Sequence, residues 1–460
     1  MNMKKKHIFL CCMPLVLAAA ACTKDFLDAK PSKSLLVPTT LSDFRALLDF
    51  SDNLNVSPGL NVISSDDFYR GDNTFISLTP VAQKTYLWAK DLYSGTTVPD
   101  WNRPYADVFT ANVVLDGLKA LKPGTYDPAE YNAIKGTALF FRGYSFYGLA
   151  QEFAAGYDPA TASSMPGVPL HLTSDVNKID GRGTLVQTYD QVLADMTEAA
   201  ALLPVNALFK SRPNKAAAQA MLARVYLSIG DYPKALAAAT ASLQQNSALT
   251  DYNTLSPGAS RPFPYPLPDA ADEVSFYATL ISISSYNSAS ATLVDTLLYA
   301  SYDASDLRKV LYFKANSSGQ HTFKGTYSGN PGMFAGIATD EIYLIRAECY
   351  ARLGDVANAL ADLNTVLITR WATGTYTPFT APDAGSALQL ILTERRKELI
   401  GRGLRWGDLK RLNVDSRFAV SLKRVIGGQT YTLAPGSPNY VLPIPDNELH
   451  TSGVPQNPRN

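Results

Sequence analysis

Residues 223–236 read ARVYLSIGDYPKAL, and residues 347–360 read AECYARLGDVANAL. Aligned without a gap, the two stretches share their first alanine, a tyrosine, a Gly-Asp pair and a closing Ala-Leu pair. Glycine ends a helix by taking the left-handed conformation without steric cost, and an aspartate that follows it can cap the next helix. Small alanines then allow the two helices to pack closely. Each stretch therefore predicts a helix, a tight turn and a second helix, and the pair predicts an internal repeat.

Two further pairs of helix-forming segments extend this repeat. One pair runs from 111–121 into 129–153, and the other runs from 189–203 into 213–229. The pattern resembles the tetratricopeptide repeat, so we expect a mostly α fold with about four helical hairpins. The alternative is a set of ordinary helical hairpins that do not stack into a superhelix.

The other parts of the chain lack helical periodicity. Residues 53–100 are rich in Asp, Asn, Ser, Thr and Gly, and they predict loops around one short helix near 81–87. Residues 250–336 include a proline-rich stretch and polar segments with tyrosines, and loops of this length are often functional. Alternating apolar residues at 429–445 predict an extended element or a hairpin. The predicted organisation is one domain at 41–460, with a helical scaffold at about 101–250 and 338–412 and small β content.

The N-terminus has the features of an export signal. Lysines at 4–6 precede an apolar run over 8–21, which is shorter than the roughly 20 residues that span a bilayer. A Leu/Ala-rich run that ends in Ala-Cys resembles the lipobox of bacterial lipoproteins, whose cysteine is acylated and becomes the first mature residue. We expect removal of residues 1–21, a lipid on Cys22 and a polar leash over 22–40. The alternative is an ordinary secretory signal followed by an accidental cysteine.

The composition argues against several classes of function. The chain has 460 residues with 41 basic and 41 acidic side chains, so its net charge gives no reason to bind nucleic acid. Of its 4 cysteines, only Cys349 lies beyond the leader and its junction, which excludes an internal disulfide. His171, His321 and His450 are far apart and lack the spacing of metal ligands. No nucleophile, paired-carboxylate or dinucleotide motif stands out, and we expect no catalysis, no cofactor and no bound metal.

A charged segment near the C-terminus carries the strongest resemblance to a known family. Residues 394–411 read ERRKELIGRGLRWGDLKR. They resemble the signature E-R-R-x-E-L followed by E-G-x-R-W-x-D-L-x-R of the SusD/RagB family, which comprises outer-membrane nutrient-binding lipoproteins of Bacteroidota. Arg402 stands where that family has a glutamate, which predicts the loss of one ion-pair partner. Shorter resemblances are Phe-Leu-Asp after Cys22, the set Trp101, Tyr105 and Asn112, the pair Asp306 and Arg308, and Leu-Pro-Ile-Pro at 442–445.

The charge pattern of this signature predicts its physical role. Its arginines and lysines would suit nucleic acid if they stood alone. However, Glu394, Glu398 and Arg402 follow one another at helical spacing, and Asp408 lies three residues from two arginines. Leucines and a tryptophan supply an apolar side. The segment therefore predicts an amphipathic, ion-paired helix against the core, and we place it outside the binding site.

The family resemblance implies a binding protein at the outer-membrane surface that has no enzymatic activity. Such proteins capture a nutrient, commonly an oligosaccharide and sometimes a peptide. They pass it to a partner SusC-like TonB-dependent transporter, on which they sit as a hinged lid. The alternatives are a peptide-binding member of the same family, a repeat scaffold that binds only proteins, and a hydrolase whose motif is not visible in the sequence.

The candidate ligand-binding residues come from loop position. Sugar rings pack their C–H faces on aromatic planes, and neighbouring polar side chains bond the hydroxyls. We therefore expect the ligand-facing portions at about 53–100 and 250–336. The candidate residues are Asp67, Tyr69, Arg70, Asn73, Trp88, Trp101 and Tyr327. Residues 88–91 are predicted to be extended. Trp101 also opens a helical hairpin, and the alternative for each aromatic ring is a place in the core.

Overall fold

The computed structural model describes residues 38–264, 272–282, 286 and 290–460. Residues 39–460 form one compact unit. The leader, Cys22 and the leash up to residue 37 lie outside the described residues. Helices dominate the described part of the chain, as predicted, and the strands are short.

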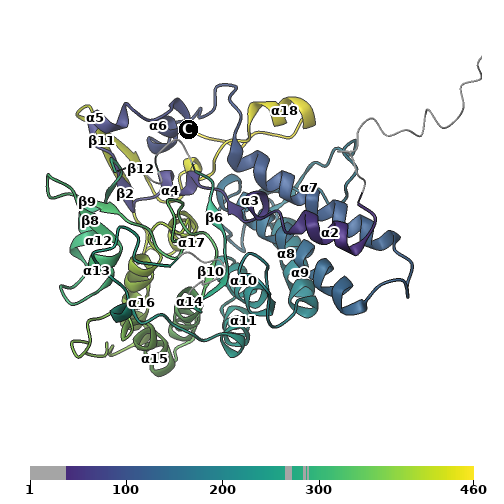
Figure 1. Ribbon diagram of the computed structural model, residues 1–460. Coiled ribbons are helices and arrows are strands. Elements are labelled where there is room, and N and C mark those ends of the chain that lie inside the picture. The colour runs from purple at the N-terminus through teal and green to yellow at the C-terminus, as the bar shows by residue number, and fades with distance from the viewer. Residues whose placement is uncertain (1–37, 265–271, 283–285, 287–289) are drawn as a thin grey trace, which may run out of the picture. The chain divides into compact units, whose positions relative to one another are not determined.

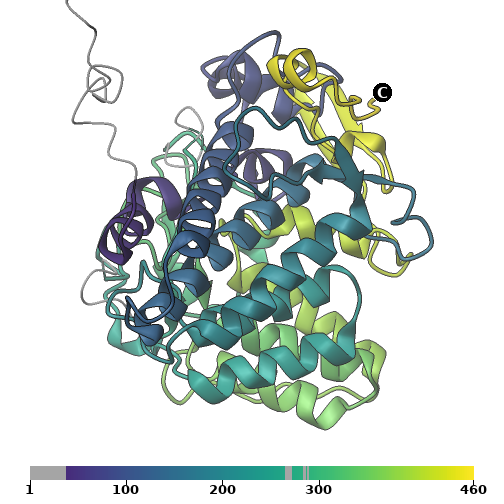
Figure 2. The same cartoon turned by 90° about the vertical axis from the view of Figure 1, so that its right-hand side faces the viewer.

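The scaffold is a succession of helices in which each packs against the next (Figure 1). The packing order continues across the long insertion, because the last helix before it lies against the first helix after it. The view in Figure 2 shows the blue and teal helices of the first half side by side. The helices are α7 (Pro99–Ala120), α8 (Pro128–Phe153), α9 (Leu185–Leu202), α10 (Lys215–Ser228), α11 (Tyr232–Gln245), α14 (Thr339–Arg352), α15 (Val356–Leu367) and α16 (Ala384–Glu398).

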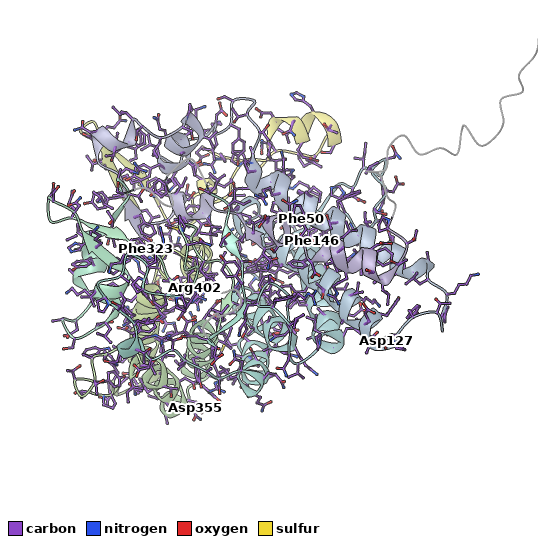
Figure 3. The ribbon with its side chains drawn as sticks, in the orientation of Figure 1. Phe50, Asp127, Phe146, Phe323, Asp355 and Arg402 are labelled. Atoms are coloured by element: carbon purple, nitrogen blue, oxygen red, sulfur yellow. The ribbon has the colours of Figure 1, made fainter. Side chains whose placement is uncertain are left out.

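The repeated Gly-Asp pair forms the junctions that the sequence predicts. Gly230 and Gly354 have φ angles of 78° and 88°, in the left-handed region that favours glycine. The Asp231 carboxylate accepts a hydrogen bond from the Lys234 amide at 3.2 Å, and the Asp355 carboxylate accepts one from the Asn358 amide at 3.1 Å. Figure 3 shows Asp355, like the α8 cap Asp127, at the periphery of the ribbon.

The first loop-rich region contains more helix than the sequence predicted. Four short helices occupy it, where one was expected near 81–87, because four- and five-residue helices show no periodicity in a sequence. Trp88 lies in a turn with a positive φ of 54°, so the prediction of extended backbone there is wrong. The helices before α7 are α2 (Leu41–Leu48), α3 (Ser51–Leu54), α4 (Leu60–Ser64), α5 (Asp72–Phe75) and α6 (Pro80–Tyr86).

The second loop-rich region supplies most of a small four-stranded sheet of order β2-β7-β9-β8. Tyr69 pairs with Leu293, and Leu293 pairs with Thr322, so these side chains share one face. Phe68 and Phe323 of this sheet contact each other at 5.6 Å between ring centroids, and Phe68 belongs to the largest core cluster. The sheet and its flanking elements are β2 (Phe68–Tyr69), β7 (Leu293–Val294), α12 (Thr296–Ala300), α13 (Arg308–Leu311), β8 (Phe313–Ala315) and β9 (His321–Phe323).

The remaining strands form two-stranded pairs. The C-terminal pair is a hairpin that turns at Gly427 and Gly428, which confirms an extended element near 429, although its first strand begins earlier than predicted. These elements are β1 (Val56–Ser57) with β6 (Thr279–Leu280), β3 (Pro166–Pro169) with β4 (Arg182–Thr184), β5 (Val274–Phe276) with β10 (Ile337–Ala338), and β11 (Leu422–Ile426) with β12 (Gln429–Leu433).

Three clusters of buried apolar side chains hold these elements together. The largest spans α7–α11 and the short elements, and aromatic rings such as Phe140, Phe146 and Phe276 fill it. A second lies between α14, α15 and α16. Within the described residues, no helix is both long enough and apolar enough to cross a bilayer. The last elements are η1 (Tyr252–Thr254), α17 (Arg405–Leu412), η2 (Pro438–Tyr440) and α18 (Asp446–Ser452).

Candidate functional site

The charged signature folds as two helices, α16 and α17, and not as the single helix that its spacing predicted. Gly401 and Gly403 between them have φ angles of 71° and 72°. A Cβ atom on Gly401 would lie 2.6 Å from the Phe323 ring, and one on Gly403 would lie 2.8 Å from the Leu280 side chain. Both the backbone conformation and the close packing therefore require glycine at the break.

Most ion pairs of the signature reach other elements and do not run along one helix. Arg308, fully buried, contacts Glu394 at 2.5 Å and Glu398 at 2.9 Å. Arg370 bridges Glu398 at 2.8 Å and Glu273 at 2.5 Å. The prediction that the signature is structural agrees with these contacts. Of the ion pairs predicted along the helix, the pair of Asp408 with Arg411 forms, and Lys397 adds an unpredicted one to Glu394 at 2.7 Å. Buried charges of this kind remain folded only because each has its partners.

Arg402 gains an ion pair where the sequence predicted the loss of one. Its guanidinium Nη1 donates to both carboxylate oxygens of Asp340, at 2.9 and 2.8 Å. The guanidinium also lies 5.1 Å from the centre of the Phe334 ring. Figure 3 shows Arg402 in the interior. Sequence spacing missed this pair because Asp340 belongs to α14, far away in the chain.

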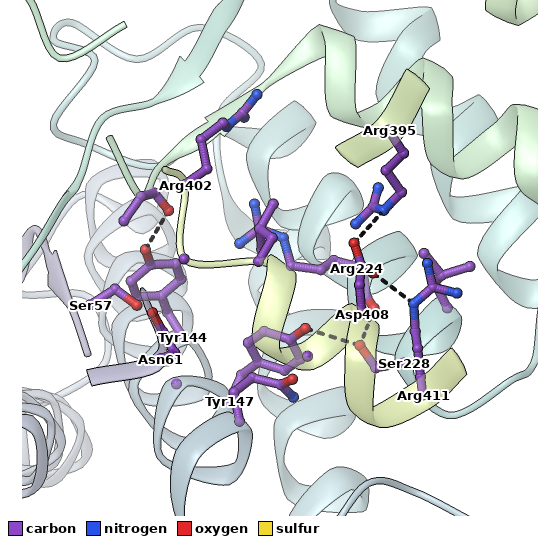
Figure 4. Close-up of a pocket in the computed structure, with 17 residues that line it drawn as sticks. Ser57, Asn61, Tyr144, Tyr147, Arg224, Ser228, Arg395, Arg402, Asp408 and Arg411 are labelled. Atoms are coloured by element: carbon purple, nitrogen blue, oxygen red, sulfur yellow. Dashed lines mark hydrogen bonds and ion pairs between the residues drawn. The ribbon is translucent and has the colours of Figure 1, made fainter. Parts of the chain in front are cut away.

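A polar cavity lies beside the signature, where α8, α10 and α17 meet (Figure 4). Arg395 and Arg411 donate to the carboxylate of Asp408 at 2.9 and 2.8 Å. Burial alone would raise the pKa of Asp408, but these arginines hold it at about 2. The cavity measures about 30 Å³, which is room for one or two water molecules and not for a sugar ring. It is therefore part of the structural network.

Three of the predicted aromatic residues are core side chains. Trp101 packs edge-on against Phe153, with 4.9 Å between ring centroids. The Tyr327 hydroxyl donates to Asp340 at 3.1 Å, and the Trp88 indole donates to the Ser64 carbonyl at 2.9 Å. All three are at least 96% buried, so a surface ligand does not reach them in this conformation. These three rings therefore lie in the core, which was the alternative considered for each predicted aromatic residue.

The other four predicted residues lie close together around β2. Tyr69 is half-buried and Asn73 is exposed, whereas Asp67 and Arg70 are buried. Arg70 lies 5.5 Å from the Tyr286 ring and donates from Nη1 to the Thr74 carbonyl at 3.4 Å. Burial lowers the pKa of Arg70, and burial raises the pKa of Asp67 to about 6 despite the nearby Arg396.

A surface cleft of about 330 Å³ lies between α12 and the pair α16 and α17. None of the predicted ligand residues lines it, but its Arg396 contacts Asp67 at 3.3 Å. Its walls combine hydrogen-bonding side chains with apolar surface, the composition that ligand sites commonly have. We call it the α12–α16 cleft. It is lined by Leu297, Leu298, Ser301, Gln389, Leu392, Thr393, Arg396, Arg405, Leu412, Arg417, Phe418, Ala419 and Val420.

Two signature arginines connect this cleft to the predicted ligand loop. Arg405 holds the Asp66 carboxylate with two hydrogen bonds, at 2.7 and 2.9 Å. Arg396 contacts Asp66 at 3.1 Å, Asp67 at 3.3 Å and Asp295 at 4.0 Å. Burial would raise the pKa of Asp66, but Arg405 and Arg396 bring it to about 2. Sequence reasoning missed this cleft because it placed the signature outside the binding site, although Arg396 keeps a quarter of its side chain exposed.

A larger cleft of about 600 Å³ lies on the other side of α17, near Met165, Tyr440 and Val441. Its one lysine, Lys410, donates to the carbonyls of Gln151 at 2.8 Å and Ala154 at 2.6 Å. The Lys410 side chain therefore caps the C-terminal end of α8. None of the predicted ligand residues lines this cleft. Among the described residues, no group of three His, Cys, Asp or Glu side chains is placed to hold a metal ion.

Comparisons with known proteins give one consistent result. Residues 25–227 match the profile of a family described as "Starch-binding associating with outer membrane", and residues 339–459 match the profile of the "SusD family". The curated "SusD-like protein P2" of Formosa agariphila is 29% identical over 137 residues, which is 29% of this chain. The match spans 25% of that relative, so the chain covers about a quarter of its length.

Solved structures share the fold over most of the chain. A SusD superfamily protein from Bacteroides thetaiotaomicron has a TM-score of 0.73 at 24% identity, and covers 91% of this chain and 100% of its own. A putative sugar binding protein from Bacteroides vulgatus gives a TM-score of 0.72 at 20% identity, with 92% and 99% covered. A "Laminarin binding SusD-like protein" gives 0.62 at 20% identity, with 91% and 99% covered.

Proposed function

Because the chain belongs to the SusD family of outer-membrane-associated binding proteins, we propose that it binds a glycan at the cell surface and delivers it to a SusC-like TonB-dependent transporter. One relative of the same fold is described as laminarin binding. The observation that carries the proposal for this chain is the α12–α16 cleft, which opens beside the predicted ligand loop. The function is binding and not cleavage.

The α12–α16 cleft has the chemistry that an oligosaccharide requires. The Phe418 ring and neighbouring leucines offer apolar surface for the C–H face of a sugar. Gln389 and Arg396 offer donors and an acceptor for hydroxyl groups. Asp67 acts through Arg396, because it fixes the guanidinium against the cleft wall.

The charges around the cleft favour a neutral glycan over an acidic one. Arg396 and Arg405 are the cations closest to the ligand loop, and Asp66, Asp67 and Asp295 surround them. Both guanidinium groups are thus already paired with these carboxylates. An acidic sugar would have to displace one of these partners and leave a carboxylate without its cation.

The N-terminal expectations complete the proposal. A lipid on Cys22 would anchor the mature chain to the outer membrane, and residues 22–40 would act as the leash between the anchor and α2. The partner transporter would receive the ligand. The alternative function within the family is peptide binding.

Titration calorimetry of the purified protein tests the proposal, with neutral oligosaccharides, acidic oligosaccharides and peptides offered in turn. We expect binding of a neutral oligosaccharide without turnover. Phe418→Ala and Gln389→Ala should each weaken that binding by roughly 10-fold, since each loss of about 1.4 kcal/mol is a factor of ten.

Arg212→Ala is the matched control for Arg396→Ala. Both arginine side chains are 25% exposed and bound to aspartates, but Arg212 lies outside the cleft. Weakened binding in Arg396→Ala alone supports the cleft, and equal affinities in both variants refute it. Binding of peptides alone would support the alternative function, and release of reducing sugar would identify a hydrolase.

A further inference from the structure

Two acidic side chains lie together in the interior, apart from the cleft and the signature. Asp100 on α7 is 1% exposed and Glu152 on α8 is fully buried. The Asp100 Oδ1 accepts hydrogen bonds from the amides of Gly59 at 2.6 Å and Leu60 at 2.8 Å. The Glu152 Oε1 accepts one from the Asn61 amide at 2.8 Å. Together they hold the first turn of α4.

The second oxygen of each of these two carboxyl groups has no amide donor. Neither Asp100 Oδ2 nor Glu152 Oε2 has a donor among the described groups of the protein. The two carboxyl groups hold the consecutive amides of residues 59–61, which brings the two side chains close to each other. A hydrogen bond between two carboxyl oxygens requires a proton on one of them. Two buried carboxylates in contact would also repel each other strongly. The pair therefore retains one proton.

The surrounding charges agree with a single shared proton. Lys410 on α17 is the cation that faces Glu152, and the Tyr93 hydroxyl faces both acids. Arg459 and Asp446 lie beyond Tyr93 and offset each other. Burial lowers the pKa of Lys410 to about 7. Below that pH, one carboxylate, one protonated carboxyl group and the Lys410 ammonium sum to zero charge, which a buried site favours.

The segment that this pair holds leads directly to the α12–α16 cleft. Residues 59–61 are bonded by the acids at one end, and Asp66 and Asp67 are bonded by Arg405 and Arg396 at the other. Arg424 fixes the middle, because its Nη2 donates to the carbonyls of Ile63 and Ser65. A continuous set of hydrogen bonds and ion pairs therefore connects residue 59 with the arginines that line the cleft.

We propose that Asp100 and Glu152 share one proton, and that this proton positions the segment 59–67 at the wall of the cleft. Loss of the proton in alkaline solution puts two carboxylates in contact and loosens α4. The shared proton stands on its own, and only its value for ligand capture rests on the proposed function.

The direction of the pH effect follows from the acids' environment. Burial raises the pKa of Asp100 to about 6, and burial together with Asp100 raises the pKa of Glu152 well above its usual range. The folded pair therefore holds two protons below about pH 6 and one shared proton above it, whereas the unfolded chain releases both near pH 4. The contribution of the pair to the free energy of unfolding is therefore greatest below about pH 4. It falls as the pH rises through about 6 and beyond.

Amide substitutions test the proposal, because an amide reproduces the shared proton without titrating. In Asp100→Asn, the carbonyl oxygen can still accept from Gly59 and Leu60 while the amide donates to Glu152. Glu152→Gln does the same in the reverse direction. The double variant places two amide donors against each other, so the bond between the two side chains cannot form. It serves as the negative control for the single variants.

Thermal unfolding between pH 5 and about pH 9 and hydrogen exchange of the backbone are the readouts. In the wild type, the melting temperature should fall by several degrees across this range, with faster exchange at residues 59–67. Either single variant should show a smaller fall than the wild type, and the double variant should melt lowest. Part of the dependence should remain in every variant, because burial raises the pKa of Asp107 to about 8 and lowers that of Lys410 to about 7. A single variant that keeps the wild-type dependence overturns the shared proton, and exchange that changes only at residues 59–61 overturns its link to the cleft. Neither readout needs the glycan, so failure of the proposed function remains distinguishable.

Discussion

At the scale of single residues, the sequence predicts local roles better than distant ones. The Gly-Asp junctions followed from two adjacent residues, and the structure confirms both the glycine conformation and the aspartate cap. The partner of Arg402 did not follow from any spacing, because Asp340 meets it only after the chain folds. The same holds for Trp88 and Trp101, whose aromatic rings suit a binding surface and a core equally well. A residue's type shows what it can bond, and the fold decides with what.

Gly354→Ala tests the glycine junction. The φ angle of 88° is strained for alanine, and no atom lies within 4 Å of the added Cβ, so strain is the main cost. We expect a loss of about 1 kcal/mol in the free energy of unfolding, measured by urea denaturation. Gly181→Ala is the control, because that site is equally open and has no positive φ. A junction variant as stable as this control would refute the assigned role.

Arg370→Met tests the buried ion-pair network. The substitution removes the cation that bridges Glu273 and Glu398 and leaves two buried carboxylates without it. We expect a loss of about 3–5 kcal/mol in the free energy of unfolding, by the same denaturation assay. Arg417→Ala removes an ion pair of an exposed arginine and should change stability far less than Arg370→Met. Similar losses in both variants would contradict the network's role.

At the scale of elements, long periodic helices were predictable and short irregular ones were not. The scaffold helices carry repeated apolar positions, whereas α3, α4 and α5 are too short to show any period. The signature was expected to be one helix, but Gly401 and Gly403 break it into α16 and α17. That break brings Arg396 and Arg405 to the α12–α16 cleft. The cleft could not be predicted from sequence, because its walls come from segments about 100 residues apart.

The link between α16 and α17 should be sensitive to acid. Asp408 joins Arg395 to Arg411, and its pKa of about 2 is lower than the value of 3.8 that it has when unfolded. The group therefore contributes about 2 kcal/mol of stability that is present above pH 4 and is lost as the pH falls through about 2. Asp408→Asn should be less stable than the wild type at pH 7, and the difference should shrink in acid.

Chemical denaturation at a series of pH values measures this difference. Asp52→Asn is the control, because Asp52 is exposed and forms no ion pair among the described residues. It should follow the wild type at every pH. A constant gap between Asp408→Asn and the wild type from neutral to strongly acidic solution would contradict the role assigned to Asp408.

At the scale of the whole molecule, the resemblance supplied the family and the fold, but not the ligand. Two family profiles and solved structures that cover 90% or more of the chain confirm the mostly α, SusD-like architecture. The identities are 24% or less, so they establish the shared fold and leave the binding surface to this chain's own side chains. Of the seven predicted ligand residues, four gather around β2 and three are core residues. Their binding role stays a prediction.

The lipid anchor is a prediction about the whole molecule in its cell. Radioactive palmitate fed to cells that express the full chain should label the wild type and leave Cys22→Ala unlabelled and released from the membrane fraction. Cys12→Ala removes a cysteine within the predicted leader and should leave the label in place. An unlabelled wild-type protein would contradict the anchor, as would equal labelling of Cys22→Ala.

The measurement that tests the central claim most directly is a crystal structure of the mature protein with the neutral oligosaccharide that calorimetry identifies. The account predicts an intact sugar chain in the α12–α16 cleft, with a ring against Phe418 and a hydroxyl bonded to Arg396. Density for the sugar in the larger cleft beside Tyr440, or a hydrolysed product at any site, would contradict it.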